Sequence, residues 1–294
     1  MNKVMKDIRF IPLKYLGTCV SDLDGTLLPH NGEISAGNLA MLEELRQSGI
    51  CRVLATGRSL FSLQKVIPPD APFDYVIFAT GAGIMDWQSK ELIYSQNLNE
   101  RQILLASKVL DELKLDYMIH KEVPDTHIMH YKAFGENPDF LDRVGIYREF
   151  ATELDPSARP SWISATQFLA IVPEQRQEVY PLLQKRLAPL TTIRTTSPLD
   201  FSSLWIEIFA PGVNKGDGLL RLLTMLGLSL QQTMVIGNDY NDLHMLEICS
   251  NAFVTANAPD DLKAQFRAVA SCAEDGFRQA AELWIQALQP DLNK

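Results

Sequence analysis

The chain has 294 residues, of which 46% are hydrophobic and 21% charged, and its formal net charge is −9. Because domains usually hold about 100 to 200 residues, this length suggests two domains. The composition is that of a soluble globular protein, and no apolar stretch reaches the roughly 18 residues that a membrane span requires. The negative charge and the lack of a basic cluster argue against nucleic acid as a partner.

The N-terminal segment and the cysteines indicate the compartment. Residues 1–14 contain basic residues but no continuous apolar region followed by a cleavage site, so we expect no export signal. The cysteines show no Cys-x-x-Cys spacing. We therefore expect a cytoplasmic protein with reduced, buried thiols at Cys19, Cys51, Cys249 and Cys272.

The first motif is a short apolar run at residues 19–23 that contains Asp22 and is followed by Asp24 and a Gly-Thr pair. The pattern predicts a buried parallel strand whose carboxyl end delivers acids into a crevice. Residues two apart share a face of a strand, and the glycine lets the chain turn away at once. Two crowded carboxylates call for a cation. The plainer alternative is a turn rich in aspartate, because Asp-Gly is a common turn dipeptide.

A helix and a second strand follow this motif. Ser35 is a suitable N-cap for a helix that Gly49 would end, and an apolar run at 50–55 then leads into Thr56, Gly57 and Arg58. One strand–helix–strand crossover fits between the two motifs, so we expect Thr56 beside Asp22 at the same edge of a parallel sheet. Taken alone, Thr-Gly-Arg could equally be the capped start of a helix.

The sequence pattern changes after a third apolar run, at 75–79, which leads into Thr80 and Gly81. The next segment alternates helices and strands, and an insertion of this length between core elements indicates a separate α+β domain over the crevice, which we term the cap. The predicted core thus comprises residues 1–84 and 200–294, and the predicted cap residues 85–199. Within the cap we predict helices at 100–113 and 174–187 and strands at 117–120, 127–130, 168–172 and 191–195.

Three cap histidines lie close together in the sequence. His120, His127 and His130 have no nearby Cys or Glu pair that would complete a metal site. We therefore interpret them as surface or packing residues.

The core is expected to resume with a strand at 204–209, near a sheet edge or the domain junction. Lys215 then opens an amphipathic helix that ends near Gly227. A cation in the first turn of a helix opposes the helix dipole, so an anion nearby would explain Lys215. The alternative is a solvated lysine.

A second acidic strand end follows the apolar run at 233–236. With Asp22 and Asp24, its carboxylates and carboxamides could supply the few protein oxygens that Mg²⁺ accepts beside water and phosphate. A turn rich in Asn and Asp is the alternative. The polar side chains of this loop are Asn238, Asp239, Tyr240, Asn241 and Asp242.

The four motifs have the order and the kinds of spacing seen in the haloacid dehalogenase-like phosphotransferases. The place of the insertion resembles the Cof-type subgroup with its type IIB cap. The resemblance covers nearly the whole chain from Leu16 onward. It implies an α/β fold, with a Rossmann-like parallel-sheet core and an inserted α+β cap domain.

The resemblance also implies roles for individual residues. Asp22 is the implied nucleophile and Asp24 the implied general acid/base, and both would contact the Mg²⁺ ion. The implied phosphate ligands are Thr56, Gly57 and Lys215, supported by Arg58 and Asn241. The resemblance implies Asn238, Asp239 and Asp242 as the remaining ligands of the metal.

Two positions depart from the family pattern. The usual Gly-Asp-x-x-Asn-Asp loop has Asn238 at its first acidic position, and the usual Asn before Gly81 is Thr80. An Asn oxygen can still ligate Mg²⁺, and Asp239 could restore the missing charge.

The expected activity is Mg²⁺-dependent hydrolysis of small phosphate monoesters, such as sugar phosphates or similar metabolites, through an aspartyl phosphate. Two alternatives remain open. A phosphomutase or phosphotransferase would need a second phosphate-binding cluster in the cap, but the arginines of the cap are scattered along the sequence. A non-catalytic phospholigand-binding module would have no use for an acid/base at Asp24. The sequence names neither the substrate nor the oligomeric state, because cap side chains would set selectivity.

Overall fold

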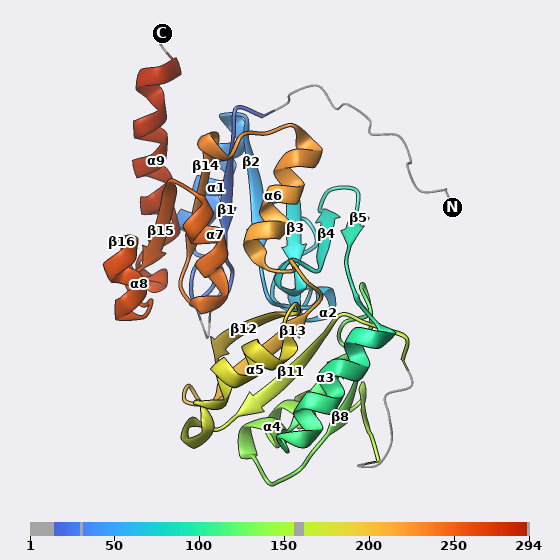
Figure 1. The fold of residues 1–294 in the computed structure, drawn as a ribbon. Coiled ribbons are helices and arrows are strands. Elements are labelled where there is room, and N and C mark those ends of the chain that lie inside the picture. Colours follow the sequence, from blue (N-terminus) through green and yellow to red (C-terminus); the bar gives the residue numbers. More distant parts are fainter. Residues whose placement is uncertain (1–14, 30–31, 156–161, 293–294) are drawn as a thin grey trace.

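The computed structural model describes residues 15–29, 32–155 and 162–292, with main chain alone considered for 288–292. Figure 1 shows a core with a second domain beneath the carboxyl ends of its central strands. None of the helices in the described ranges combines the length and the apolar character that a membrane crossing needs.

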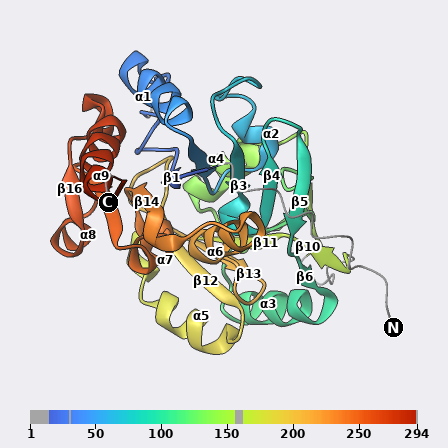
Figure 2. The ribbon, with the colours of Figure 1, turned by 90° about the horizontal axis from the view of Figure 1, so that it is seen from above.

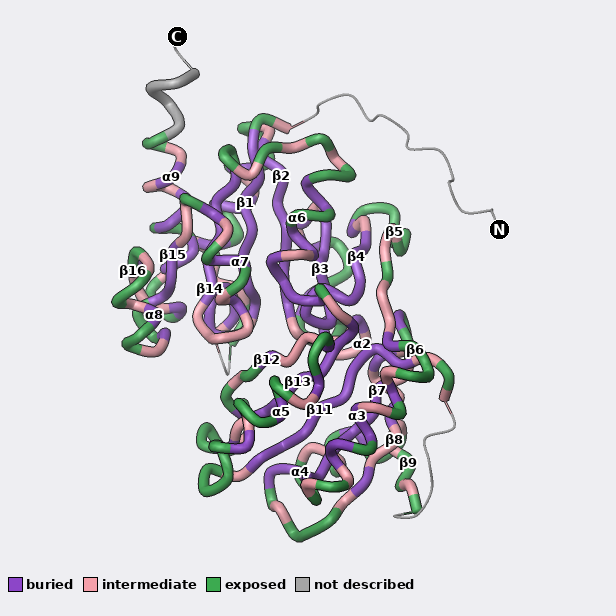
Figure 3. The backbone as a smooth tube through the Cα atoms, in the orientation of Figure 1, coloured by how far each residue is buried: buried purple, intermediate pink, exposed green. Residues whose placement is uncertain are grey.

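The core is one sheet in the order β16-β15-β14-β1-β2-β3-β4-β5. Its parallel strands from β16 to β3 confirm the predicted parallel-sheet core, whereas β4 and β5 are antiparallel at one edge. Every residue of β1 is buried, as the apolar run predicted (Figure 3). The strands are β1 (Gly17–Ser21), β2 (Ile50–Ala55), β3 (Tyr75–Phe78), β4 (Gly83–Asp86), β5 (Glu91–Ser95), β14 (Thr233–Gly237), β15 (Asn251–Thr255) and β16 (Arg267–Val269).

Helices cover both faces of the core sheet, as the view in Figure 2 shows. α1 (Ala36–Gln47) and α9 (Gly276–Leu292) pack on one face, and α6 (Lys215–Leu226) and α7 (Leu243–Ile248) pack on the other. Two short helices, α2 (Leu60–Leu63) and α8 (Asp260–Gln265), follow β2 and precede β16.

Local signals set the ends of these helices. The Ser35 hydroxyl accepts a hydrogen bond from the amide of Asn38, which caps α1 as predicted. Gly227 ends α6 at a φ of 67°, a left-handed conformation that glycine adopts without strain. The four cysteines are free and buried.

The cap is built on a second sheet in the order β12-β13-β11-β7-β8-β9. α3 (Glu100–Glu112) and α5 (Val179–Leu187) pack on one face, and α4 (Pro138–Ile146) packs on the other. A small ladder joins β6 (Leu98–Asn99) to β10 (Ser164–Ala165). The strands of the cap sheet are β7 (Tyr117–His120), β8 (Met129–Lys132), β9 (Ala151–Glu153), β11 (Gln167–Val172), β12 (Thr191–Thr196) and β13 (Leu204–Phe209).

Most elements predicted for the cap are present, with small shifts. The strand predicted at 127–130 is β8 and begins at Met129. The helix predicted at 174–187 is a 3-10 turn, η2 (Glu174–Arg176), followed by α5 from Val179.

The predicted domain boundaries need correction. β4 and β5 continue the core sheet to Ser95, and β13 lies between β12 and β11 in the cap sheet rather than in the core. By sheet membership, the chain therefore passes from core to cap after Ser95 and returns to the core after Phe209. Both points are later than the predicted boundaries at 84/85 and 199/200. The apolar pattern of β13 shows only that this strand is buried; its sheet is decided by pairing with β11 and β12, which sequence periodicity does not reveal.

Candidate active site

The carboxyl ends of β1, β2 and β14 meet at the edge of the core sheet that faces the cap (Figure 1). Asp22 follows β1 and continues the ladder, because its amide donates to the Ile236 carbonyl at 3.0 Å. Thr56 follows β2, two positions beyond the residue that pairs with Ser21. The sheet register therefore brings the predicted strand-end motifs to one place.

Lys215 forms the buried centre of the site. Its side chain is 0% exposed, and Nζ lies 2.6 Å from Asp22 Oδ1 and 2.7 Å from Asp242 Oδ1. Lys215 Nζ also donates to the side-chain oxygen of Asn241, Oδ1, at 3.5 Å. Burial alone would lower the pKa of Lys215, but the two carboxylates outweigh it and hold that pKa above its ordinary value. The predicted nearby anion is thus a pair of aspartates.

Asp22 is a buried carboxylate whose pKa is well above its ordinary value. Burial raises its pKa to about 7, and the charge of Asp242 acts in the same direction. The ion pair with Lys215 opposes both effects without cancelling them. An acid with this pKa changes its charge near neutral pH, as is common for groups at functional sites.

The side chain of Asn238 lies against both aspartates of the first motif. With its amide nitrogen turned toward them, it donates to Asp22 Oδ2 at 3.1 Å and to the main-chain oxygen of Asp24 at 2.9 Å. The Thr26 hydroxyl lies at 3.0 Å. Gly25, at a φ of 77°, permits this approach, because a Cβ there would come within 2.5 Å of the end of the Asn238 side chain.

These groups suit a hard cation. No three His, Cys, Asp or Glu side chains in the described part of the chain gather into a metal-binding group, so an ion here would also need neutral oxygens. The Asp22 carboxylate, the Asp24 carbonyl and the Asn238 carboxamide supply such a set once the carboxamide turns its oxygen inward. Mg²⁺ accepts one or two carboxylates together with neutral oxygens and water, so the donors fit it.

Arg58 holds Asp24 from the opposite side. Its Nε and Nη2 donate to the two carboxylate oxygens at 2.7 and 2.6 Å, in a bidentate pair. Nη1 donates to the Ser62 hydroxyl at 3.1 Å, and the Arg58 amide donates to Thr56 Oγ1 at 3.1 Å. Arg58 was predicted only as a supporting residue, and the structure shows that it fixes the position of Asp24.

Other predicted residues complete the cluster. Asp242 is fully buried, and its Oδ2 accepts the main-chain amides of Asn238 and Asp239 at 2.8 and 3.1 Å. Gly57 lies beside Asn241, since a Cβ on Gly57 would be 3.8 Å from the Asn241 amide nitrogen. The acidic loop is thus folded around Asp242.

Asp239 is not brought into this cluster. Its Oδ2 accepts from the Thr195 hydroxyl at 2.7 Å and from the Thr196 amide at 3.2 Å, both in β12 of the cap. Its Oδ1 accepts from the Tyr240 amide at 2.7 Å. Of the candidate metal ligands, Asp239 is therefore the one that joins the loop to the cap.

Glu207 is a further residue of this region that was not predicted from the sequence, and it lies at the core–cap junction. Glu207 lies on β13, and its Oε2 accepts from the Thr80 hydroxyl at 2.9 Å. The available signal was one acidic residue within the apolar run at 204–209. Two of the cap histidines pack against aromatic rings, as predicted: His127 stacks on Phe61 and His130 packs on Trp162.

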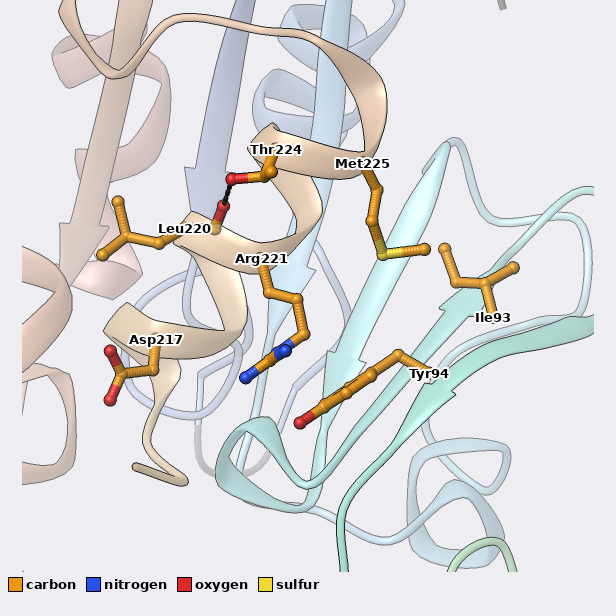
Figure 4. Close-up of a pocket in the computed structure, with 7 residues that line it drawn as sticks. All are labelled: Ile93, Tyr94, Asp217, Leu220, Arg221, Thr224 and Met225. Carbon is orange, nitrogen blue, oxygen red and sulfur yellow. Dashed lines mark hydrogen bonds between the residues drawn. The ribbon is translucent and has the colours of Figure 1, made fainter. Parts of the chain in front are cut away.

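A separate hollow of about 480 Å³ lies between α6 and β5 (Figure 4). The Arg221 guanidinium stacks over the Tyr94 ring there, at 4.3 Å from its centre, beside the apolar side chains of Ile93 and Met225. None of the predicted site residues lines it. This hollow is therefore distinct from the buried cluster around Lys215.

The profile of the haloacid dehalogenase-like hydrolase family matches residues 19–279. The chain therefore belongs to this family of hydrolases, as the four motifs predicted. An HMP-PP phosphatase from Klebsiella pneumoniae is 25% identical over 279 residues, covering 92% of this chain and 96% of that protein. The phosphatase YwpJ from Bacillus subtilis is 22% identical over 266 residues, covering 83% of this chain and 90% of its own.

Solved structures share the fold. One, described as a sugar phosphatase of HAD subclass IIB, superposes with a TM-score of 0.72 at 19% identity and covers 91% of this chain and 98% of its own. A phosphatase of the same superfamily from Bacteroides thetaiotaomicron gives a TM-score of 0.73 at 19% identity, with 92% and 96% coverage. These likenesses confirm the predicted architecture of an α/β core with an inserted cap.

Proposed function

We propose that this hydrolase is a Mg²⁺-dependent phosphatase of small phosphate monoesters, including sugar phosphates, and that it forms an aspartyl phosphate on Asp22. The observation that carries the proposal is the fully buried Lys215, which bonds both Asp22 and Asp242. A buried cation beside a carboxylate at a strand end supplies positive charge where a phosphoryl group would be attacked. The names of the relatives, both phosphatases, support the same activity.

In the first chemical step, a carboxylate oxygen of Asp22 attacks phosphorus in line with the ester oxygen. The new bond joins Asp22 to phosphorus, the ester P–O bond breaks, and the departing alkoxide takes a proton from Asp24. In the second step Asp24, now a carboxylate, takes a proton from water, which attacks phosphorus and releases Asp22 and inorganic phosphate. One residue thus serves both steps, and Arg58 holds its carboxyl group in position.

The other residues of the cluster bind and orient the phosphoryl group. Lys215 offsets its charge, and the Thr56 hydroxyl, the Gly57 amide and the Asn241 carboxamide offer hydrogen bonds to its oxygens. Mg²⁺, when bound by Asp22, the Asp24 carbonyl and Asn238, supplies further positive charge for the phosphoryl oxygens.

The test compares the wild type with Asp22→Asn on p-nitrophenyl phosphate and a panel of sugar phosphates, with Mg²⁺ or with EDTA. We expect wild-type turnover that requires Mg²⁺, and a loss of at least about 10³-fold in the Asn variant, because the change keeps the shape and deletes the nucleophile. Asp86→Asn, at the end of β4, is the matched control and should retain activity. Near wild-type turnover by Asp22→Asn, with deamidation excluded by mass spectrometry, would show that the covalent mechanism is wrong.

A further inference from the structure

One face of the cap sheet turns polar where it meets the core. On β13, Glu207 shares a face with Trp205 and Phe209, because side chains alternate along a strand. The register pairs Phe209 with Gln167 on β11, and Gln167 with His120 on β7, so these side chains lie on the same face. We call Glu207, Gln167 and His120, together with Arg143 of α4, the cap polar cluster.

Glu207 links this cluster to the candidate active site. It is 7% exposed, accepts from Thr80 at 2.9 Å, and lies 3.4 Å from the Gln167 amide nitrogen. Burial raises its pKa, and the hydrogen bond from Thr80 and the charges of Lys215 and Arg143 oppose that rise. Glu207 is therefore close enough to feel the phosphate-site lysine and the cap arginine at once.

His120 contributes an acceptor that no other group uses. Its Nδ1 lies 2.8 Å from the Thr126 carbonyl oxygen, and since a carbonyl can only accept, Nδ1 carries the proton. Burial and the nearby charge of Arg143 lower the pKa of His120 to about 4, so the ring is neutral at pH 7. Nε2 then has a free lone pair on a side chain that is 4% exposed, and it has no hydrogen-bond partner among the described residues.

Arg143 contributes a buried donor that also lacks a hydrogen-bond partner among the described residues. Its guanidinium lies over the rings of Tyr147 and Trp205, at 4.3 and 5.2 Å from their centres. Its buried Nε has no hydrogen-bond partner within the described ranges. Arg58, which holds Asp24, is among the charges that act on Arg143. Arg143 thus lies near Arg58, which holds Asp24, the residue proposed to give a proton to the ester's leaving group.

We propose that the cap polar cluster binds the alcohol part of the substrate and selects a neutral, polyhydroxylated leaving group over one that carries a second phosphate. The inference rests on the proposed phosphatase function. Hydroxyl groups both donate and accept, as the mixture of an arginine, an amide, a carboxylate and a neutral histidine requires. Glu207 places a carboxylate close enough to act on the charge of Arg143, so a second phosphate would meet a negative charge as well as this cation.

The test measures kcat/KM for a hexose 6-phosphate and for a hexose 1,6-bisphosphate, each relative to p-nitrophenyl phosphate hydrolysed by the same variant. We expect the wild type to prefer the monophosphate by at least about 10-fold. Glu207→Gln keeps the shape and the acceptor for Thr80 but removes the charge, and it should shrink that preference by about 10-fold, mainly through the KM of the bisphosphate. His120→Phe removes the free acceptor and should raise the KM of the hexose 6-phosphate about 5-fold.

Glu153→Gln, a matched change on the exposed strand β9, is the control and should leave all three rates unchanged. Thermal unfolding of each variant checks that it is folded. A wild type that hydrolyses p-nitrophenyl phosphate but takes the bisphosphate equally well, or a preference unaltered by Glu207→Gln, overturns this inference alone. A wild type that hydrolyses none of the three esters overturns the proposed function, and this inference with it.

Discussion

Two buried carboxylates share one lysine in the site, so their negative charges exceed the positive charge of their common partner. Asp22 and Asp242 lie 2.6 and 2.7 Å from Lys215 Nζ, so ionisation of both leaves one negative charge without compensation. The raised pKa of Asp22, about 7, reflects burial first and the charge of Asp242 second. The ionised carboxylate that the proposed mechanism needs at Asp22 is therefore the form that burial disfavours.

We expect Asp22→Asn to raise the free energy of unfolding at pH 8 in EDTA by about 1 to 2 kcal/mol, with a smaller effect at pH 5.5. The folded pKa of about 7 exceeds the ordinary 3.8, so the folded protein keeps a proton that the unfolded chain releases. Wild-type stability therefore falls as the pH rises from about 4 to about 7, and the loss is complete above pH 7. The Asn side chain cannot ionise, so the variant escapes this loss.

Urea unfolding of both proteins at the two pH values measures the effect. The expected gain is smaller than the full pKa shift would give, because the variant also loses the ion pair with Lys215. Equal stability of wild type and variant at pH 8 would contradict the prediction.

Asn238 is the second residue whose identity matters at this scale, because it stands where the family has a carboxylate. We expect Asn238→Asp to lower the Mg²⁺ concentration for half-saturation by about 10-fold, measured by calorimetry as well as by rate. The carboxamide already contacts Asp22 and the Asp24 carbonyl, so a carboxylate there would add charge directly to the proposed Mg²⁺ site.

The variants Asp239→Ala and Asp242→Ala test which residues of the loop bind Mg²⁺. Asp242→Ala should lose more activity than Asn238→Ala at saturating Mg²⁺, because it removes a partner of Lys215 and the acceptor of two loop amides. Asp239→Ala should leave Mg²⁺ binding nearly intact. A severe defect in Mg²⁺ binding confined to Asp239→Ala would show that Asp239, and not Asn238, is the metal ligand in this loop.

Among the elements, the turn η1 (Ala79–Gly81) connects Thr56, at the end of β2, to Glu207 of the cap sheet. Ala79 and Thr80 have φ values of 46° and 55°, in the left-handed region that a β-branched residue rarely adopts. The Thr80 amide donates to the Thr56 carbonyl at 3.0 Å while its hydroxyl donates to Glu207. The surrounding contacts hold Thr80 in a conformation that Asn, the usual family residue, would adopt more easily.

We expect Thr80→Val to lower the free energy of unfolding by about 1 to 3 kcal/mol, because it leaves a buried oxygen of Glu207 without its donor. Thr80→Ser keeps the hydroxyl and removes the branching methyl, so it should be neutral or slightly stabilising. Chemical unfolding of both variants against the wild type measures the difference. If Val and Ser have the same effect, the hydrogen bond to Glu207 is not what stabilises the turn.

Elements with a local signature could be predicted from the sequence. The strand ends that carry Asp22 and Asn238, the capped helix α1 and the glycine-terminated helix α6 each depend on neighbouring residues, and the structure contains all of them. The sheet to which β13 belongs could not be predicted, because its partners β11 and β12 lie elsewhere in the chain. For the same reason the cap polar cluster was missed: its residues come from separate elements, β7, α4, β11 and β13.

At the scale of the whole molecule, polar and aromatic contacts join the cap to the core. Asp239 bonds Thr195, and Arg194 lies over the Tyr240 ring, at 4.0 Å from its centre. Polar interfaces between domains of one chain resemble transient interfaces, so relative motion of the two domains is the default expectation. This suits a cap that has to admit a substrate and then cover it.

The two crossings between core and cap lie side by side, because the Gln96 side chain donates to the Pro211 carbonyl at 2.8 Å. Every strand of the core sheet lies outside the segment between these two residues. We therefore expect a chain in which residues 97–210 are replaced by a linker of about five Gly and Ser residues to fold as the core alone. It should still hydrolyse p-nitrophenyl phosphate, although more slowly because water is no longer excluded from the site.

This shortened chain should lose the preference between a hexose 6-phosphate and a hexose 1,6-bisphosphate, because the side chains proposed to read the leaving group lie in the removed segment. The ratio of the two kcat/KM values should approach about 1, whereas the value for p-nitrophenyl phosphate falls by about 10- to 100-fold. The Asp22→Asn version of the shortened chain, which should be inactive, controls for a contaminating phosphatase. A shortened chain that folds and keeps the wild-type ratio would show that the core, and not the cap, selects the substrate.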